Sequence, residues 1–174
     1  MMTALSQLTV LMSFILNISD SASGQISSFT EYATFELQPG VKLQIVAAPF
    51  DSTKHSIERC KIVDWTGVCL IDNEPVFGTD WEIPRSSIKR IYLKVNDRKI
   101  ELESSSMFNP WFTKPDERSF SLQRWTQEGW IVRGYFSDAA GSYVAEWRVI
   151  KDKSIRTVIS SDESIIISFF HDKK

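Results

Sequence analysis

The stretch Tyr143–Ile150, YVAEWRVI, alternates between two kinds of side chain. Four apolar side chains share one face: Tyr143, Ala145, Trp147 and Val149. Glu146 and Arg148 lie on the opposite face, together with Val144 and Ile150. Because successive side chains of a strand point to opposite faces of a sheet, this pattern predicts a β-strand with one face in the core.

The segments on both sides of this stretch are also rich in residues that favour strands. Trp130–Ser137 precedes it across the short connection Asp138–Ser142, and Ser154–Ser160 follows it across Lys151–Lys153. Strands joined by short connections are antiparallel neighbours. The sequence therefore predicts three adjacent antiparallel strands here.

Similar runs, separated by Gly, Pro, Asn, Asp and Ser, predict strands along the rest of the chain. They are Thr30–Leu37, Lys42–Ala47, Ile57–Val63, Val68–Ile71, Ile88–Val95, Lys99–Glu103, Ser119–Trp125 and Ile165–Phe170. Asn96 and Asp97 mark a tight hairpin. The last run is apolar on both faces, which indicates a central strand or contact with another surface. We expect an all-β, antiparallel meander that forms either a β-sandwich or a partly closed barrel.

The N-terminus has the features of an export signal. An apolar run of about 11 residues, Leu8–Ile18, is shorter than the roughly 20 that span a bilayer, and Ala22-Ser23-Gly24 resembles a cleavage site. We expect residues 1–24 to be a signal peptide and residues 25–174 to form one all-β domain. No cysteine follows the run to accept lipid, so no stable membrane anchor is expected. The predicted location is periplasmic or secreted.

Cysteine content and charge fit an exported protein that does not bind nucleic acid. The two cysteines, Cys60 and Cys69, flank a turn-like segment and are expected to form a disulfide, as is usual in oxidising compartments. The chain has 20 Lys and Arg against 22 Asp and Glu, and these charges are scattered. Without a basic patch, binding to nucleic acid is not expected.

The inventory of catalytic groups is poor, and we predict that the chain is not an enzyme. Its two histidines are His55, beside Ser56 in a polar loop, and His171 in the C-terminal tail. A serine triad needs a rigidly held histidine. We expect no metal and no cofactor, since the ligands for zinc are lacking and the acidic stretch Asp72–Glu82 matches no Ca²⁺ loop. Glu101 and Glu103 share a strand face and have the residue types of a carboxylate pair for glycoside cleavage, but any half-exposed strand shows this pattern.

Two loops are candidate surfaces for a protein partner. Ser104–Pro115, SSSMFNPWFTKP, carries four large apolar side chains, and interface hot spots are enriched in such groups. The candidate contacts in this loop are Met107, Phe108, Asn109, Trp111 and Phe112. The alternative is that the loop folds back and plugs one end of the sandwich or barrel. A second loop lies within Phe136–Trp147, where small residues permit close approach, and Asp138 and Tyr143 are its candidate contacts.

Three segments resemble motifs of small exported bacterial proteins of the periplasmic toxin-immunity or inhibitor type. They are IDNEPVFGTDWEIPRSSIKRIYLKV (Ile71–Val95), MFNPWF (Met107–Phe112) and FSDAAGSYVAEWRV (Phe136–Val149). The resemblance implies a protein that binds and blocks a toxin's active site and has no chemistry of its own.

The function predicted from the sequence is therefore that of a periplasmic immunity protein or inhibitor, which neutralises an antibacterial effector or a cell-wall enzyme by direct binding. A lipocalin-like carrier of small molecules is the first alternative, because an aromatic-rich barrel can enclose an apolar ligand. A hydrolase that uses Glu101, Glu103 or the Asp72–Glu82 stretch is the second. A homodimer through the apolar last strand stays open.

Overall fold

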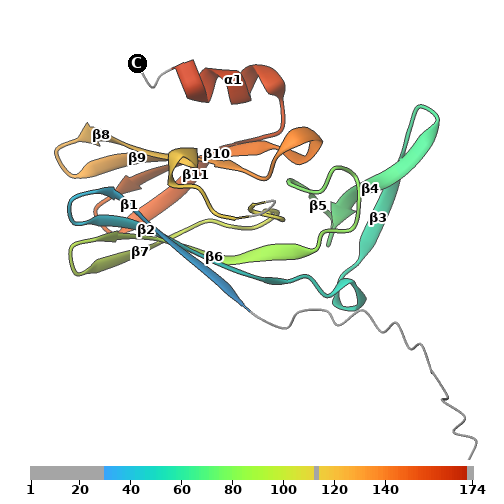
Figure 1. Ribbon diagram of the computed structural model, residues 1–174, viewed down its shortest axis with the longest axis horizontal. Coiled ribbons are helices and arrows are strands. Elements are labelled where there is room, and N and C mark those ends of the chain that lie inside the picture. The colour runs from blue at the N-terminus through green and yellow to red at the C-terminus, as the bar shows by residue number, and fades with distance from the viewer. Residues whose placement is uncertain (1–29, 112–113, 172–174) are drawn as a thin grey trace, which may run out of the picture.

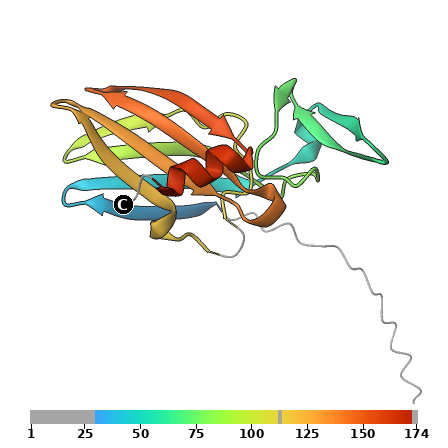
Figure 2. The same cartoon turned by 90° about the horizontal axis from the view of Figure 1, so that it is seen from above.

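The computed structural model describes residues 30–111 and 114–171, in which two four-stranded antiparallel sheets pack face to face (Figures 1 and 2). The first sheet has the order β1-β2-β6-β7: β1 (Glu31–Gln38), β2 (Val41–Pro49), β6 (Ser86–Val95) and β7 (Arg98–Leu102). The second has the order β11-β10-β9-β8: β8 (Phe120–Thr126), β9 (Gly129–Phe136), β10 (Tyr143–Ile150) and β11 (Lys153–Ser160). The sheets do not close into a barrel, so the sandwich alternative is confirmed.

A third, small sheet interrupts the meander between β2 and β6. It contains β3 (Ile57–Ile62), β4 (Trp65–Ile71) and β5 (Glu74–Pro75), and it projects from one end of the sandwich as an arm (Figure 1). The predicted disulfide between Cys60 and Cys69 is confirmed and joins β3 to β4, with the two Cα atoms 5.7 Å apart. The short 3₁₀ helices are η1 (Ser52–Lys54), η2 (Glu117–Ser119) and η3 (Ala139–Gly141).

The core lies between the two large sheets and is filled by side chains. Tyr143, Ala145, Trp147 and Val149 of β10 are all fully buried, which confirms the face predicted from the sequence. They pack against residues from both sheets, including Leu43, Ile45, Ile91 and Leu93. The tight hairpin at Asn96 and Asp97 is also confirmed, and Asn96 adopts φ 52°.

The strand predicted over Ile165–Phe170 is wrong, because these residues lie in the helix α1 (Glu163–His171). Asp162 caps this helix: its carboxylate accepts a hydrogen bond from the Ser164 amide (2.8 Å), and its carbonyl accepts one from the Ile166 amide (2.9 Å). Such a cap satisfies amides that a helix start leaves unpaired. The helix lies on the outer face of the second sheet instead of extending it (Figure 2), with Ile166 and Phe169 half-buried and Ile165 and Ile167 exposed.

The helix explains why the outer face of β10 is also buried at Val144 and Glu146. The Arg133 guanidinium lies 5.0 Å from the centre of the Phe169 ring of α1. Beneath it, the Glu146 carboxylate accepts hydrogen bonds from Arg133 (2.8 Å) and from the Thr157 hydroxyl (2.8 Å). A buried carboxylate is tolerated when it is paired in this way. Within the described residues, no helix is long and apolar enough to cross a membrane.

Candidate functional site

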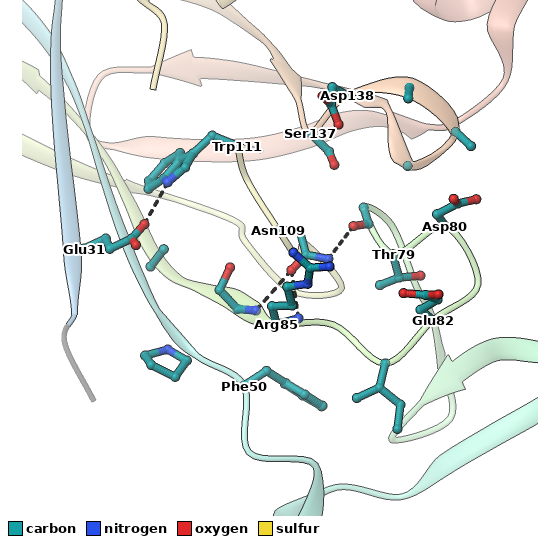
Figure 3. A pocket seen from close by; sticks show the side chains of 18 of the residues that line it. Glu31, Phe50, Thr79, Asp80, Glu82, Arg85, Asn109, Trp111, Ser137 and Asp138 are labelled. Carbon is teal, nitrogen blue, oxygen red and sulfur yellow. Dashed lines mark hydrogen bonds between the residues drawn. The ribbon is translucent and has the colours of Figure 1, made fainter. Parts of the chain in front are cut away.

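A cavity of about 670 Å³ lies at the end of the sandwich that carries the arm (Figure 3). Three segments that are far apart in the sequence form most of its wall. They are the loop after β5, the loop after β7 and the loop between β9 and β10. The sequence singled out each of these segments separately, and the structure brings them together at one cavity.

Asn109 fixes the loop after β7 to the loop after β5. Its side-chain oxygen accepts hydrogen bonds from the backbone amides of Arg85 (2.9 Å) and Ser86 (3.1 Å), and its amide nitrogen donates to the Gly78 carbonyl (2.7 Å) (Figure 3). The third loop joins them through the Ser137 amide, which donates to the Pro110 carbonyl (3.0 Å). Asn109 therefore holds the cavity wall, in addition to lining the cavity.

Trp111 forms another part of the wall. Its indole nitrogen donates a hydrogen bond to the Glu31 carboxylate at the start of β1 (2.7 Å) (Figure 3). The ring is half-buried, packs partly against the core, and leaves the rest of its surface at the cavity. Asn109, Trp111 and Asp138 are the predicted contacts, among the described residues, that line the cavity and are at least partly exposed.

Other predicted contacts belong to the core. Met107 is 1% exposed and Tyr143 is fully buried, and Phe108 is also buried. The Tyr143 hydroxyl donates to the Phe108 carbonyl (3.1 Å). Burial removes these three side chains from the set of surface contacts, so this part of the aromatic loop is the plug that the sequence left as the alternative. Phe112 lies outside the described residues.

The buried phenol of Tyr143 predicts a dependence of stability on alkaline pH. Burial raises the pKa of Tyr143 well above its usual value. Below a pH of about 10 both the folded and unfolded states hold the neutral phenol, whereas at higher pH only the unfolded state ionises. The free energy of unfolding should then fall by up to about 1.4 kcal/mol per pH unit. Urea unfolding from about pH 8 to pH 11 checks this, and an equally steep loss in Tyr143→Phe would contradict it.

Several residues around the cavity adopt left-handed backbone conformations that non-glycine residues seldom occupy. They are Asp80 (φ 45°), Trp81 (φ 63°), Asn109 (φ 40°), Ser137 (φ 60°) and Ala139 (φ 45°). Such conformations cost on the order of 1 kcal/mol each and gather at functional sites, where the surrounding structure enforces them. Four of these residues line the cavity. The concentration of strain at one place favours a functional role for this end of the sandwich.

The charges around the cavity are mostly negative. Glu31, Asp80, Glu82 and Asp138 contribute carboxylates, and Arg85 contributes the one cation among the lining residues that the structure describes. Within residues 30–111 and 114–171, no carboxylate lies within 4.0 Å of the Arg85 guanidinium.

Of the candidate catalytic groups, Asp80 and Glu82 line this cavity, whereas His55, Glu101 and Glu103 do not. His55 bonds through Nδ1 to the Asp72 carboxylate (2.6 Å), and this hydrogen bond, with one from the Ser56 amide, lowers the pKa of Asp72. The acidic stretch is thereby divided, because Asp72 pairs with His55 while Asp80 and Glu82 reach the cavity.

Glu103 lies elsewhere, after β7. A hydrogen bond from the Ser105 backbone amide (2.8 Å) is the main cause of its lowered pKa, the opposite of what a general acid needs. Among the described residues, the one cluster with metal-ligand types is Glu58, Cys60 and Cys69, and both of its sulfurs are in the disulfide.

Sequence reasoning missed Glu31, Arg85 and the small residues Ala139–Gly141 as parts of one site. Glu31 lies near the start of the predicted strand Thr30–Leu37, Arg85 lies before the predicted strand Ile88–Val95, and neither has a local signal of its own. The only signal for the 139–141 segment was its small side chains. No model of a protein family, no curated protein and no solved structure matches this chain at a significant level.

Proposed function

We propose that this chain is an exported protein that binds another protein, as a periplasmic immunity protein or inhibitor, and that the cavity-bearing end of the sandwich is its recognition surface. The observation that carries the proposal is the convergence of three loops on one cavity, where Asn109 holds two of the loops together and strained backbone conformations gather. Rigid loops at one end of a β-sandwich are a common way to present a binding surface.

Exposed apolar groups extend this surface toward the arm. Trp81 (43% exposed) and Ile83 (42%) flank Glu82 in the loop after β5, and Trp65 (47%) lies beside Trp81 with its ring at 5.7 Å in an edge-to-face arrangement. Aromatic residues are enriched in protein interfaces and depleted from free surfaces. A large partner that contacts both the cavity and the exposed side chains of Trp65, Trp81 and Ile83 accounts for this exposure better than a small ligand does.

The filled core argues against the carrier alternative. Trp147, Tyr143 and Phe136 occupy the space between the sheets, where a lipocalin-like protein holds its ligand. The disulfide is compatible with an oxidising compartment and so supports export.

The test is affinity capture from a periplasmic extract of the source bacterium with the protein and two variants. Ala140→Arg places a long side chain at the cavity, where Ala140 is exposed in η3. Ser161→Arg adds the same side chain at an exposed position before α1 and serves as the control. We expect stoichiometric capture of a toxin or wall-degrading enzyme by the protein and by Ser161→Arg, and a loss of about 2 kcal/mol, roughly thirtyfold in Kd, for Ala140→Arg.

Two results would count against the proposal. One is capture of a partner with equal affinity by Ala140→Arg and the unchanged protein, which would place the interface elsewhere. The other is that no protein is captured and a small molecule, identified by mass spectrometry, co-elutes with the chain. That result would favour the function of a small-molecule carrier.

A further inference from the structure

We infer that the cavity receives a basic segment of the partner protein, with a lysine or arginine side chain inserted between its carboxylates. This inference rests on the proposed function and specifies the chemistry of the partner. It is based on the arrangement of charge, on the hydroxyl of Thr79, which has no hydrogen-bond partner among the described residues, and on the aromatic walls of the cavity.

The carboxylates come from separate parts of the fold and surround the cavity. Glu31 begins β1, Asp80 and Glu82 lie in the loop after β5, and Asp138 lies in the loop before η3 (Figure 3). With Arg85 as the one opposing charge among the described lining residues, the excess is negative. Complementary potentials across an interface speed association and exclude wrong partners, so this excess favours a positively charged group.

Thr79 supplies an observation that is independent of the charges. Its side chain lines the cavity, is only 8% exposed, and lies beside Glu82 in Figure 3. Among the residues that the structure describes, its hydroxyl makes no hydrogen bond, and it is not one of the side-chain atoms that are closed off from solvent without a partner, so it is open to a group in the cavity. Because a hydroxyl accepts hydrogen bonds from an ammonium or a guanidinium, a basic side chain that enters here would satisfy it.

The aromatic walls fit the rest of a long basic side chain. Trp111 and Phe50 contribute apolar surface to the cavity, and lysine and arginine bury their aliphatic stems against such surface while their charged ends remain solvated or paired. Outside the cavity, the half-exposed Trp81 and Trp65 offer ring faces to further cations of the same segment. Gly67 permits this pair, since a Cβ there would lie 2.5 Å from the Trp81 Cβ and 2.6 Å from the Trp65 ring.

Arg85 makes the inference sharply testable. Its guanidinium has no ion pair within the described part of the chain, so it would attract an acidic partner and repel a basic one. Removal of this charge should therefore strengthen the binding of a basic segment and weaken the binding of an acidic one.

The experiment titrates the ¹⁵N-labelled protein with two end-blocked peptides of alternating residues, one of glycine and lysine and the other of glycine and glutamate. We expect the lysine peptide to shift the amide signals of Asp80, Glu82 and Asp138, and the glutamate peptide to leave them unchanged. The double variant Asp80→Asn with Asp138→Asn should bind the lysine peptide about fivefold more weakly. Asparagine keeps the shape of aspartate and tolerates the left-handed backbone of residue 80.

The matched variants complete the test. Asp97→Asn, in the β6–β7 turn, removes one charge away from the cavity lining and should bind the lysine peptide as the unchanged protein does. Arg85→Gln should bind it about threefold more tightly. Shifts caused by the glutamate peptide and abolished by Arg85→Gln would overturn the inference, as would unchanged lysine-peptide binding by the double variant.

The failure of this inference and the failure of the proposed function are distinguishable. A captured partner that requires the cavity, combined with no response to the lysine peptide, overturns the basic-segment inference alone. Lysine-peptide binding at the cavity, combined with no captured protein, overturns the proposed function alone.

Discussion

Replacement of Gly78 by alanine is expected to lower the free energy of unfolding by about 3 kcal/mol. Gly78 adopts φ 95°, a conformation that L-residues rarely adopt, and an added Cβ would lie 2.1 Å from the Phe108 carbonyl oxygen and 2.8 Å from the Tyr143 ring. Both neighbours are fixed, because the Tyr143 hydroxyl donates to that same carbonyl. The clash cannot be relieved without moving the loop after β7 away from the core.

Urea unfolding measures this effect, and Gly40→Ala is the matched control. Gly40, in the turn between β1 and β2, also has a positive φ (76°), but a Cβ there meets only the Asn96 side-chain oxygen at 2.9 Å. That side chain can move, so the expected loss is about 1 kcal/mol. Equal losses for Gly78→Ala and Gly40→Ala would show that backbone conformation alone, and not the contact with Phe108, determines the cost.

Asn109→Ala is expected to cost about 3 kcal/mol of stability and to weaken partner binding as well. The change removes three hydrogen bonds and leaves two backbone amides and one carbonyl without these partners. Alanine is also poorer than asparagine at φ 40°. Chemical denaturation gives the stability, and the capture experiment gives the binding.

Asn109→Asp separates the two contributions. Aspartate keeps the acceptor for the Arg85 and Ser86 amides but replaces the donor to Gly78 with an oxygen that the Gly78 carbonyl repels, so its cost measures the loss of the Gly78 bond while the two amide bonds remain. If Asn109→Ala instead unfolds like the unchanged protein yet no longer binds the partner, Asn109 acts as a direct contact and not as the support of the wall.

Much of the fold was predictable because period-two alternation is a local signal. The pattern of Tyr143–Ile150 identified a strand and its buried face, and short connections identified its neighbours. The helix α1 was missed because Ile165–Phe170 is apolar except for Ser168, and an apolar run of that length has no period that separates a strand from a helix. The Asp162 cap was the available signal. The two long strands of the arm and its disulfide were predicted, but their separation into a third sheet was not, because nothing local says that β6 pairs with β2 and not with β5.

Less of the site was predictable, since it is made by the meeting of distant loops. The aromatic content of Ser104–Pro115 marked the loop but could not divide it into Met107, which faces the core, and Trp111, which reaches the cavity. That division depends on two isolated β-bridges, which pair Phe77 with Met107 and Ser87 with Phe108. Both join segments that are far apart in the sequence, so no local pattern predicts them.

The central claim, that the cavity-bearing end of the sandwich is the recognition surface, is tested most directly by site-specific photo-crosslinking in the periplasm. A photoreactive phenylalanine analogue replaces Ala140 in one variant and Ser161, before α1, in another. We predict a discrete protein adduct from position 140 and none from position 161. An adduct from position 161, with none from position 140, would contradict the account.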